Sequence, residues 1–216
     1  MTSPSAPIRV YSLTSYDRGA KVRWLLTELG VGYESQWLDS DKKEYETPEF
    51  LKLNPMGRVP VLQIGDMAMF ESGAICSYLG DLYADRGIAP KVDSADRATY
   101  QQWMYFASTT LDTVQTRIMV IEDIPAGEIQ VQKLAALQSD LRESMVALNR
   151  TLSKDSFLVG NRFTVADISV SYHLYWCMMW PELEMVTKDY PRVLSYLERM
   201  KSMPSAVKAE VFSYEG

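Results

Sequence analysis

The sequence predicts two domains of different classes, a small α/β domain in residues 1–84 and an all-helical domain in residues 95–216. Strand and helix signals alternate in the first part of the chain, whereas every later apolar pattern has helical spacing. Between the two parts, residues 85–94 (DRGIAPKVDS) are polar and interrupted by glycine and proline, as is typical of an interdomain linker. The 216 residues are enough for two domains that each bury a core.

The α/β domain begins with a strand candidate at residues 8–13. A helix should follow, because apolar residues recur there at i, i+3, i+4 and i+7: Val22, Leu25, Leu26 and Leu29. Gly30 is placed to end that helix. Residues 33–38 are typical of a second strand. After a longer link, residues 59–64 and 67–70 flank a two-residue hairpin signal, Gly65-Asp66.

Helical stripes continue to the end of the chain. One stripe follows the hairpin and consists of Ile75, Tyr78, Leu79 and Leu82. A long stripe opens the second domain and consists of Tyr100, Trp103, Met104, Ala107, Leu111, Val114 and Ile118. The next stripe consists of Leu134, Leu137, Leu141, Leu148 and Leu152. Thr164 and Asp167 have the spacing of a capping box, so a further helix should begin there. A last helix is predicted from Pro191, because proline is accepted in a first turn.

Composition excludes several classes of function. A net charge of −6 and a pI near 4.9 argue against nucleic-acid binding, which needs a basic face. No apolar run of 18 residues is present, so no membrane span is expected. The segment Met1–Pro7 lacks the apolar core of a signal peptide, which predicts a cytoplasmic location.

The chain has few residues that could hold a metal or act as a base. Cys76 and Cys177 are far apart in apolar surroundings and are expected to be buried, inert thiols. His173 is the single histidine and lies in an aromatic helical run, so a packed helix residue is expected. No zinc site or Ser-His-Asp triad can be assembled comfortably from these residues, and no metal cofactor is predicted.

The most informative stretch lies just before and after the predicted hairpin. Proline has no backbone N–H to donate to a neighbouring strand, so Pro60 indicates either an edge strand or bulge without a function, or a backbone bend with a function. Glu71 and Ser72 stand at a predicted helix start, where unpaired amides and the helix dipole favour a carboxylate. A plain helix cap is the alternative for these two residues. Arg58 could pair with another carboxylate or could simply be an exposed loop residue.

These residues resemble the glutathione site of the cytosolic glutathione transferases. The similar motif is Asn54-Pro55-x-Gly57-x-Val59-Pro60-x-Leu62 with Glu71-Ser72, and a second marker is the segment from Gly160 to Asp167. The resemblance implies a thioredoxin-like first domain, β-α-β-α-β-β-α, a helical second domain and a homodimer. It implies that Pro60 is cis, that the Val59 backbone pairs with the cysteinyl part of glutathione, and that Ser72 and Glu71 hold its γ-glutamyl carboxylate and ammonium.

Such an enzyme has to hold glutathione as a thiolate, and one hydroxyl near the start of the first helix suffices for this. Lowering a thiol pKa by two units requires roughly 2.7 kcal/mol, and a hydrogen bond to a charged group supplies about 1.5–3 kcal/mol. Depending on the alignment, the hydroxyl of the Ser-type members falls on Ser15 or Tyr16, with Thr14 as a third candidate. Arg18 could favour the thiolate electrostatically. The absence of cysteine in this loop excludes the Cys-type members.

The expected function is addition of the glutathione thiolate to small hydrophobic electrophiles, with isomerisation or peroxide reduction as related activities. The electrophile pocket should lie between the domains, with Met104, Tyr105 and Thr109 as candidates. The alternative is a non-catalytic binding or regulatory protein of the same fold, as among the family's transcription- and translation-associated members. The irregular turn at residues 14–18 keeps this alternative open.

Overall fold

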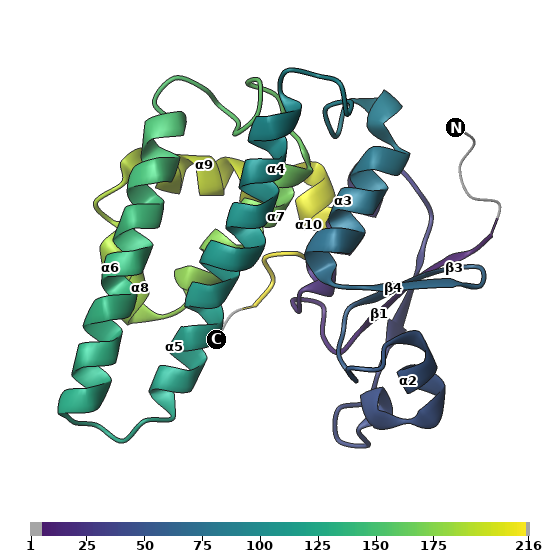
Figure 1. Ribbon diagram of the computed structural model, residues 1–216, viewed down its shortest axis with the longest axis horizontal. Coiled ribbons are helices and arrows are strands. Elements are labelled where there is room, and N and C mark those ends of the chain that lie inside the picture. Colours follow the sequence, from purple (N-terminus) through teal and green to yellow (C-terminus); the bar gives the residue numbers. More distant parts are fainter. Residues whose placement is uncertain (1–5, 215–216) are drawn as a thin grey trace. The chain divides into compact units, whose positions relative to one another are not determined.

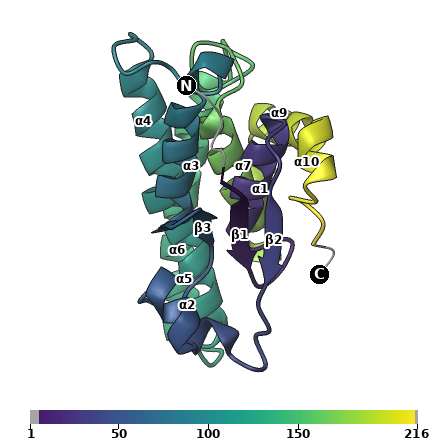
Figure 2. The same ribbon diagram turned by 90° about the vertical axis from the view of Figure 1, so that its right-hand side faces the viewer.

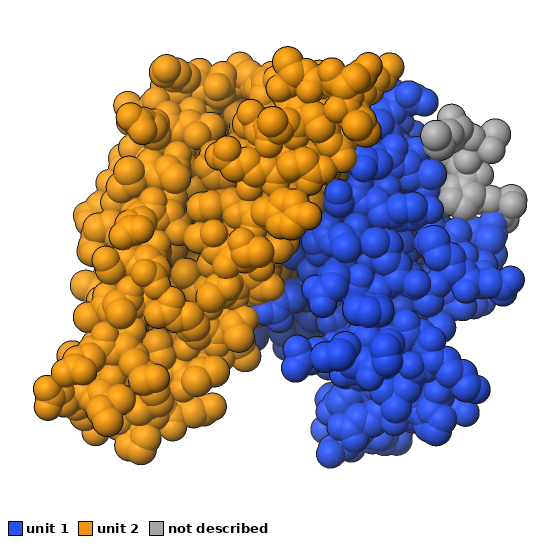
Figure 3. All heavy atoms as spheres, in the orientation of Figure 1, with its two compact units in different colours: residues 1–89, 201–215 blue, residues 90–200, 216 orange. Residues whose placement is uncertain are grey.

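The computed structural model describes residues 6–214, which form two compact units (Figure 3). One unit contains the residues up to Ala89 together with the C-terminal segment from Lys201 on, and the other runs from Pro90 to Met200. The sequence predicted that the helical domain extends to residue 216, so the grouping of the C-terminal segment with the α/β unit is a difference. The segment Met1–Pro7, expected to lack a signal peptide, lies almost entirely outside the described residues.

A four-stranded sheet in the order β2-β1-β3-β4 forms the centre of the α/β unit. Its strands are β1 (Ile8–Ser12), β2 (Glu34–Trp37), β3 (Val61–Ile64) and β4 (Met67–Phe70). β1 and β2 are parallel, and the other pairs are antiparallel. Helices α1 (Gly19–Glu28) and α3 (Ser72–Leu82) cover one face, and α2 (Pro48–Leu53) lies on the other (Figures 1 and 2). This confirms the predicted thioredoxin-like order β-α-β-α-β-β-α.

Local chemistry explains where several elements begin and end. The Thr47 hydroxyl accepts the Phe50 N–H at 3.3 Å and so caps α2, whose first residue is proline. Gly30 follows α1 with a φ of +61°, which confirms it as the residue that ends this helix. Gly65 has a φ of +58° between the paired residues at the ends of β3 and β4, so the predicted hairpin is also confirmed.

The α/β unit includes one helix from the far end of the chain. Short 3₁₀ turns, η1 (Glu44–Glu46) and η2 (Ala84–Arg86), occur in its loops, and α10 (Pro204–Lys208) packs against α1. Trp24 of α1 is fully buried, and its indole N–H donates to the Ser205 hydroxyl at 3.0 Å. Its ring also meets the ring of Phe212 edge-on, with 5.5 Å between the centroids. These contacts attach the C-terminal segment to α1.

The regular elements of the second unit are all helices, as predicted, and an isolated β-bridge joins Val159 to Arg162. Its elements are α4 (Arg97–Tyr105), η3 (Phe106–Leu111), α5 (Asp112–Glu122), α6 (Glu128–Thr151), α7 (Val165–Cys177), α8 (Pro181–Thr187) and α9 (Pro191–Lys201). The first long stripe is confirmed as helical, but it contains a π-helical stretch, η3, that the apolar spacing did not predict. Helix α7 contacts α4, η3 and α5, and all its residues except Trp176 are buried.

Asp167 is the third residue of α7 and forms the predicted capping box with Thr164, and its carboxylate is completely buried. One oxygen accepts the N–H of Thr164 at 2.9 Å, and the other accepts the Leu158 N–H at 3.0 Å and the Tyr196 hydroxyl at 3.1 Å. Burial outweighs these hydrogen bonds and raises the pKa of Asp167 to about 6. This carboxylate therefore joins three segments of the helical unit.

The remaining titratable residues of interest are packed in the interior. His173 is fully buried, with Nδ1 at 3.1 Å from Oε1 of Gln115, which confirms a packed helix residue. Cys76 and Cys177 are buried free thiols, as expected, and burial raises their pKa values to about 11 and about 12. Across residues 6–214, no helix has the length and apolarity for a membrane span, and no three His, Cys, Asp or Glu residues gather as metal ligands.

Candidate functional site

Three loops lie at one end of the four-stranded sheet. Tyr11 at the end of β1 pairs with Val61 at the start of β3, and Val61 pairs with Phe70 at the end of β4. The residues after β1, before β3 and after β4 must therefore lie at the same end of the sheet. The structure thus gathers the segments that contain every predicted site residue: Ser15, Tyr16, Arg58, Val59, Pro60, Glu71 and Ser72.

The loop before β3 is shaped by Asn54, which is only 3% exposed. Its side-chain amide donates to the Arg58 carbonyl at 2.7 Å, and its side-chain oxygen accepts the Met56 N–H at 3.0 Å. Gly57 has a φ of +59°, and a Cβ there would lie 3.1 Å from the Tyr45 carbonyl oxygen. The Asn and Gly of the motif thus fix the turn that leads to the next residues.

The peptide bond between Val59 and Pro60 is cis, as the resemblance implied. The predicted strand 59–64 is wrong at its start, because β3 begins at Val61, after the proline that has no N–H to donate. Pro60 is buried and Val59 is partly exposed. The described residues supply no hydrogen-bond partner for the Val59 N–H or C=O, so both groups can serve a ligand.

Glu71 and Ser72 lie at the start of α3. Glu71 has a φ of +70° and makes no side-chain cap hydrogen bond, and Ser72 is the first residue of the helix and 8% exposed. Within residues 6–214 neither side chain has a hydrogen-bond partner. The exposed guanidinium of Arg58 likewise forms no ion pair in the described part of the chain. A carboxylate, a hydroxyl and a guanidinium are thus all available at this end of the sheet.

The loop after β1 is held together by Asp17, whose role sequence reasoning missed. One carboxylate oxygen accepts the N–H of Leu13 at 2.7 Å and that of Thr14 at 3.2 Å, and the other accepts the Gly19 N–H at 2.7 Å. A single side chain therefore ties both ends of the loop. The available signal was an aspartate two residues before a helix start, where its side chain often binds nearby amides.

The C-terminal segment contacts this loop at both candidate hydroxyl residues. The hydroxyl oxygens of Ser15 and Ser213 are 3.4 Å apart, and the rings of Tyr16 and Tyr214 meet edge-on with centroids 5.0 Å apart. Ser15 and Tyr16 are both half-buried. No local pattern could have indicated these contacts, because they join residues 198 apart in the sequence.

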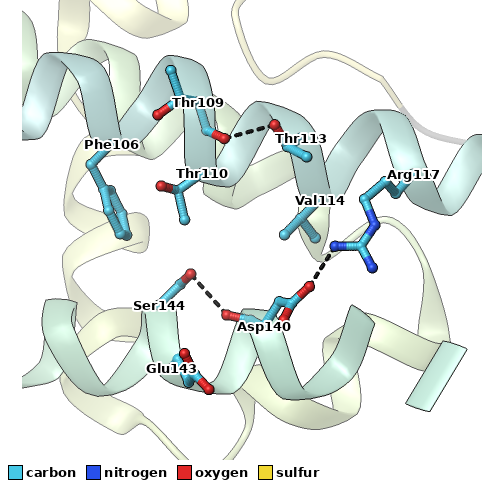
Figure 4. A pocket seen from close by; sticks show the side chains of 9 residues that line it. All are labelled: Phe106, Thr109, Thr110, Thr113, Val114, Arg117, Asp140, Glu143 and Ser144. Carbon is cyan, nitrogen blue, oxygen red and sulfur yellow. Dashed lines mark hydrogen bonds and ion pairs between the residues drawn. The ribbon is translucent and has the colours of Figure 1, made fainter. Parts of the chain in front are cut away.

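The helical unit contains a separate open cavity of about 390 Å³ between η3, α5 and α6 (Figure 4). It is lined by Phe106, Thr109, Thr110, Thr113, Val114, Arg117, Asp140, Glu143 and Ser144. Of the three predicted pocket residues, Thr109 lines this cavity, Met104 is buried and Tyr105 is 67% exposed. Several polar groups of the cavity already bond within the protein, including Arg117 with Asp140 and the Ser144 hydroxyl with the Asp140 carbonyl.

The thioredoxin-like unit, with a cis proline before β3, and the all-helical unit that follows it along the chain define a class of two-domain proteins. Family comparisons identify the family within that class. The model described as "Glutathione S-transferase, N-terminal domain" matches residues 6–81, and that for the glutathione S-transferase C-terminal domain matches residues 131–199. The chain belongs to the glutathione S-transferase family.

Individual relatives come from two groups of proteins. Elongation factor 1-gamma 3 of Oryza sativa is 32% identical over 163 residues, which are 76% of this chain but only 39% of that protein. Glutathione S-transferase 1 of Schizosaccharomyces pombe is 27% identical and aligns over 91% of this chain and 93% of its own. The solved glutathione transferase URE2P6 of Phanerochaete chrysosporium, in complex with oxidized glutathione, has a TM-score of 0.84, 27% identity and 97% coverage of both chains.

Proposed function

We propose that the protein is a glutathione transferase that adds the glutathione thiolate to small hydrophobic electrophiles. The observation that carries this proposal is the set of available polar groups at one end of the sheet. The Val59 backbone and the side chains of Arg58, Glu71 and Ser72 have no protein partner in the described residues, and each is of the type that a peptide ligand needs. A scaffold without a ligand has no need to keep such groups available.

Each group has a place in glutathione binding. The Ser72 hydroxyl and the amides at the start of α3 would bind the γ-glutamyl carboxylate, while Glu71 accepts the ammonium. The Val59 N–H and C=O would pair with the cysteinyl part, and Arg58 with the glycyl carboxylate. The cysteinyl sulfur then lies toward the loop after β1, where Ser15 or Tyr16 donates a hydrogen bond to it.

The reaction needs a thiolate and a route for its proton. The thiol loses its proton to solvent, and the thiolate is stabilised by the donated hydrogen bond of the activating hydroxyl. With a chloronitrobenzene, the sulfur forms a bond to the ring carbon, and chloride leaves with the electron pair of the C–Cl bond. The same thiolate could also serve isomerisation or peroxide reduction.

The direct test is turnover of 1-chloro-2,4-dinitrobenzene with glutathione by the purified full chain. We expect formation of the glutathione conjugate above the uncatalysed rate, saturable in both substrates, together with retention on immobilised glutathione. Retention without turnover of this or other electrophiles would contradict the transferase proposal. Absence of both turnover and retention would also contradict the proposed glutathione site.

A second candidate is a non-catalytic binding role, which is favoured by the relatives named elongation factor 1-gamma. This chain spans about 39% of the length of the first of them, so nothing of that protein's assembly transfers directly. Retention on glutathione without turnover is the result that this candidate predicts. A homodimer and a cytoplasmic location stay predictions from the sequence, and sedimentation velocity tests the first.

Removing the groups at the start of α3 should weaken glutathione binding. We expect Ser72→Ala and Glu71→Gln each to raise the glutathione Kd by about 10- to 100-fold. Ser72→Ala removes a hydrogen bond to the carboxylate, and Glu71→Gln removes the charge that pairs with the ammonium, and a hydrogen bond to a charged group is worth about 1.5–3 kcal/mol. Isothermal titration calorimetry measures the change. Ser77→Ala, in the same helix, is the matched control and should leave the Kd unchanged. An unchanged Kd in both site variants would place the glutamyl group elsewhere.

A further inference from the structure

Arg23 belongs to α1, but its guanidinium binds the loop that precedes the helix. Arg23 is only 3% exposed, although an arginine is rarely buried unless its charge is paired. Its Nη1 donates to the Ser12 hydroxyl at 2.6 Å, and its Nη2 donates to the carbonyl oxygens of Thr14, at 3.3 Å, and Ser15. One side chain thus holds two successive peptide groups of the loop that carries the candidate hydroxyls.

The space around this guanidinium is closely fitted. A Cβ on Gly19 would lie 2.3 Å from the Ser12 hydroxyl oxygen, 2.8 Å from an Asp17 carboxylate oxygen and 3.1 Å from Arg23 Nη1. Three polar side chains therefore meet at a position that only glycine can occupy. The guanidinium carbon also lies over the Trp37 ring, 4.9 Å from its centroid, so a cation–π contact adds to these hydrogen bonds.

Two opposite charges thus bind the same loop through different backbone groups. The Asp17 carboxylate holds N–H groups at both ends of the loop, and the Arg23 guanidinium holds carbonyls in its middle. Fixing the carbonyls of Thr14 and Ser15 fixes the peptide planes on both sides of Ser15. The direction of its Cα–Cβ bond, and the starting direction of Tyr16, are then determined.

We propose that Arg23 is a positioning residue that orients the thiol-activating hydroxyl through the carbonyls of Thr14 and Ser15. This inference rests on the proposed transferase function. Orientation matters because a hydrogen-bond donor displaced by about 1 Å can cost about a hundredfold in rate. The guanidinium is also permanently charged and little exposed, so its positive potential favours a nearby thiolate with little screening.

The test compares Arg23→Gln and Arg23→Lys with Arg86→Gln as a matched control. Arg86 also donates to a backbone carbonyl, that of Leu29, and its guanidinium carbon lies 5.1 Å from the Tyr83 ring centroid. It belongs to the same unit but binds a different loop. The readouts are the kinetics with 1-chloro-2,4-dinitrobenzene, their pH profile, and hydrogen exchange of the amides of residues 13–19.

For Arg23→Gln we expect kcat to fall at least about tenfold while KM for glutathione changes less than about threefold. The acidic limb of the kcat/KM profile should move up by about one pH unit, and the loop amides should exchange faster. Arg23→Lys keeps a charge but cannot span the Ser12 hydroxyl and both carbonyls, so it should restore only part of kcat. Arg86→Gln should leave the kinetics and the loop exchange unchanged.

Several outcomes would overturn the positioning role. These are unchanged loop exchange in Arg23→Gln, unchanged kcat in an active protein, or equal effects in Arg86→Gln. If Arg23→Gln does not fold, Arg23→Lys decides by the same readouts. If the unmodified protein neither turns over nor retains glutathione, the proposed function fails, and loop exchange in the Arg23 variants still decides whether Arg23 orders the loop.

Discussion

Replacing Ser15 with alanine should lower kcat/KM for 1-chloro-2,4-dinitrobenzene by about 10- to 100-fold at pH 6.5. The variant loses a hydrogen bond to a thiolate worth about 1.5–3 kcal/mol, and each 1.36 kcal/mol is a factor of ten. The pKa of bound glutathione should rise by about one to two units, so the deficit should shrink above pH 9. Thiolate absorbance near 240 nm and the pH–rate profile measure both effects, and the glutathione Kd should change little.

The neighbouring hydroxyls provide the comparison. With Ser15 as the donor, Tyr16→Phe and Thr14→Val should each change kcat/KM less than about threefold, because neither variant removes the Ser15 hydroxyl. If Tyr16→Phe causes the large loss and Ser15→Ala does not, then the activating hydroxyl belongs to Tyr16. Its ring is already held against Tyr214, which would suit such a role. If all three variants keep full activity, this loop does not activate the thiol.

Replacing Asp167 with asparagine should lower the free energy of unfolding by about 2–3 kcal/mol at pH 8. In Asp167 one carboxylate oxygen accepts the Thr164 N–H, and the other accepts the Leu158 N–H and the Tyr196 hydroxyl. Asparagine has only one side-chain oxygen, so it cannot accept at both positions. At least one buried donor then loses its partner, which costs about 1–3 kcal/mol. Urea unfolding followed by circular dichroism measures the loss.

The same variant should reveal a pH dependence of known sign. The pKa of Asp167 is raised to about 6, above its ordinary value, so the native state binds the proton more tightly than the unfolded chain does. The stability from this group is therefore fully present below about pH 4 and is lost as pH rises through about 6. The difference in the free energy of unfolding between the original protein and Asp167→Asn should be about 1.4 kcal/mol larger at pH 5 than at pH 8.

A surface carboxylate serves as the control for both measurements. Asp140 pairs with Arg117, and its side chain is 51% exposed. Asp140→Asn should change the unfolding free energy by less than about 1 kcal/mol, because exposed ion pairs contribute little. If the difference in unfolding free energy between the original protein and Asp167→Asn became smaller in acid, the pKa of Asp167 would lie below its ordinary value instead.

The features that were predictable from sequence depend on short-range chemistry. The hairpin at Gly65, the end of α1 at Gly30 and the capping box at Asp167 each follow from residues a few positions apart. The motif from Asn54 to Leu62 was equally local, since Asn54 and Gly57 shape the turn that precedes Pro60. These elements could therefore be predicted to within a few residues.

The remaining features depend on contacts that sequence spacing does not encode. The π-helical stretch η3 changes the hydrogen-bond pattern without a change in apolar spacing, so it was not predicted. Arg23 occupies an ordinary helical position, and its role appears only when the preceding loop is folded beside it. The contact of Ser213 with Ser15 requires the chain to return to its first helix.

The grouping of the C-terminal segment with the α/β unit has a consequence during synthesis. The sheet and α1 leave the ribosome before the helical unit has been translated, and α10 follows only after it. Trp24 therefore meets Ser205 and Phe212 only after the chain has emerged past residue 212. Although domains commonly fold in the order of their synthesis, here the first unit to emerge is the last to be completed.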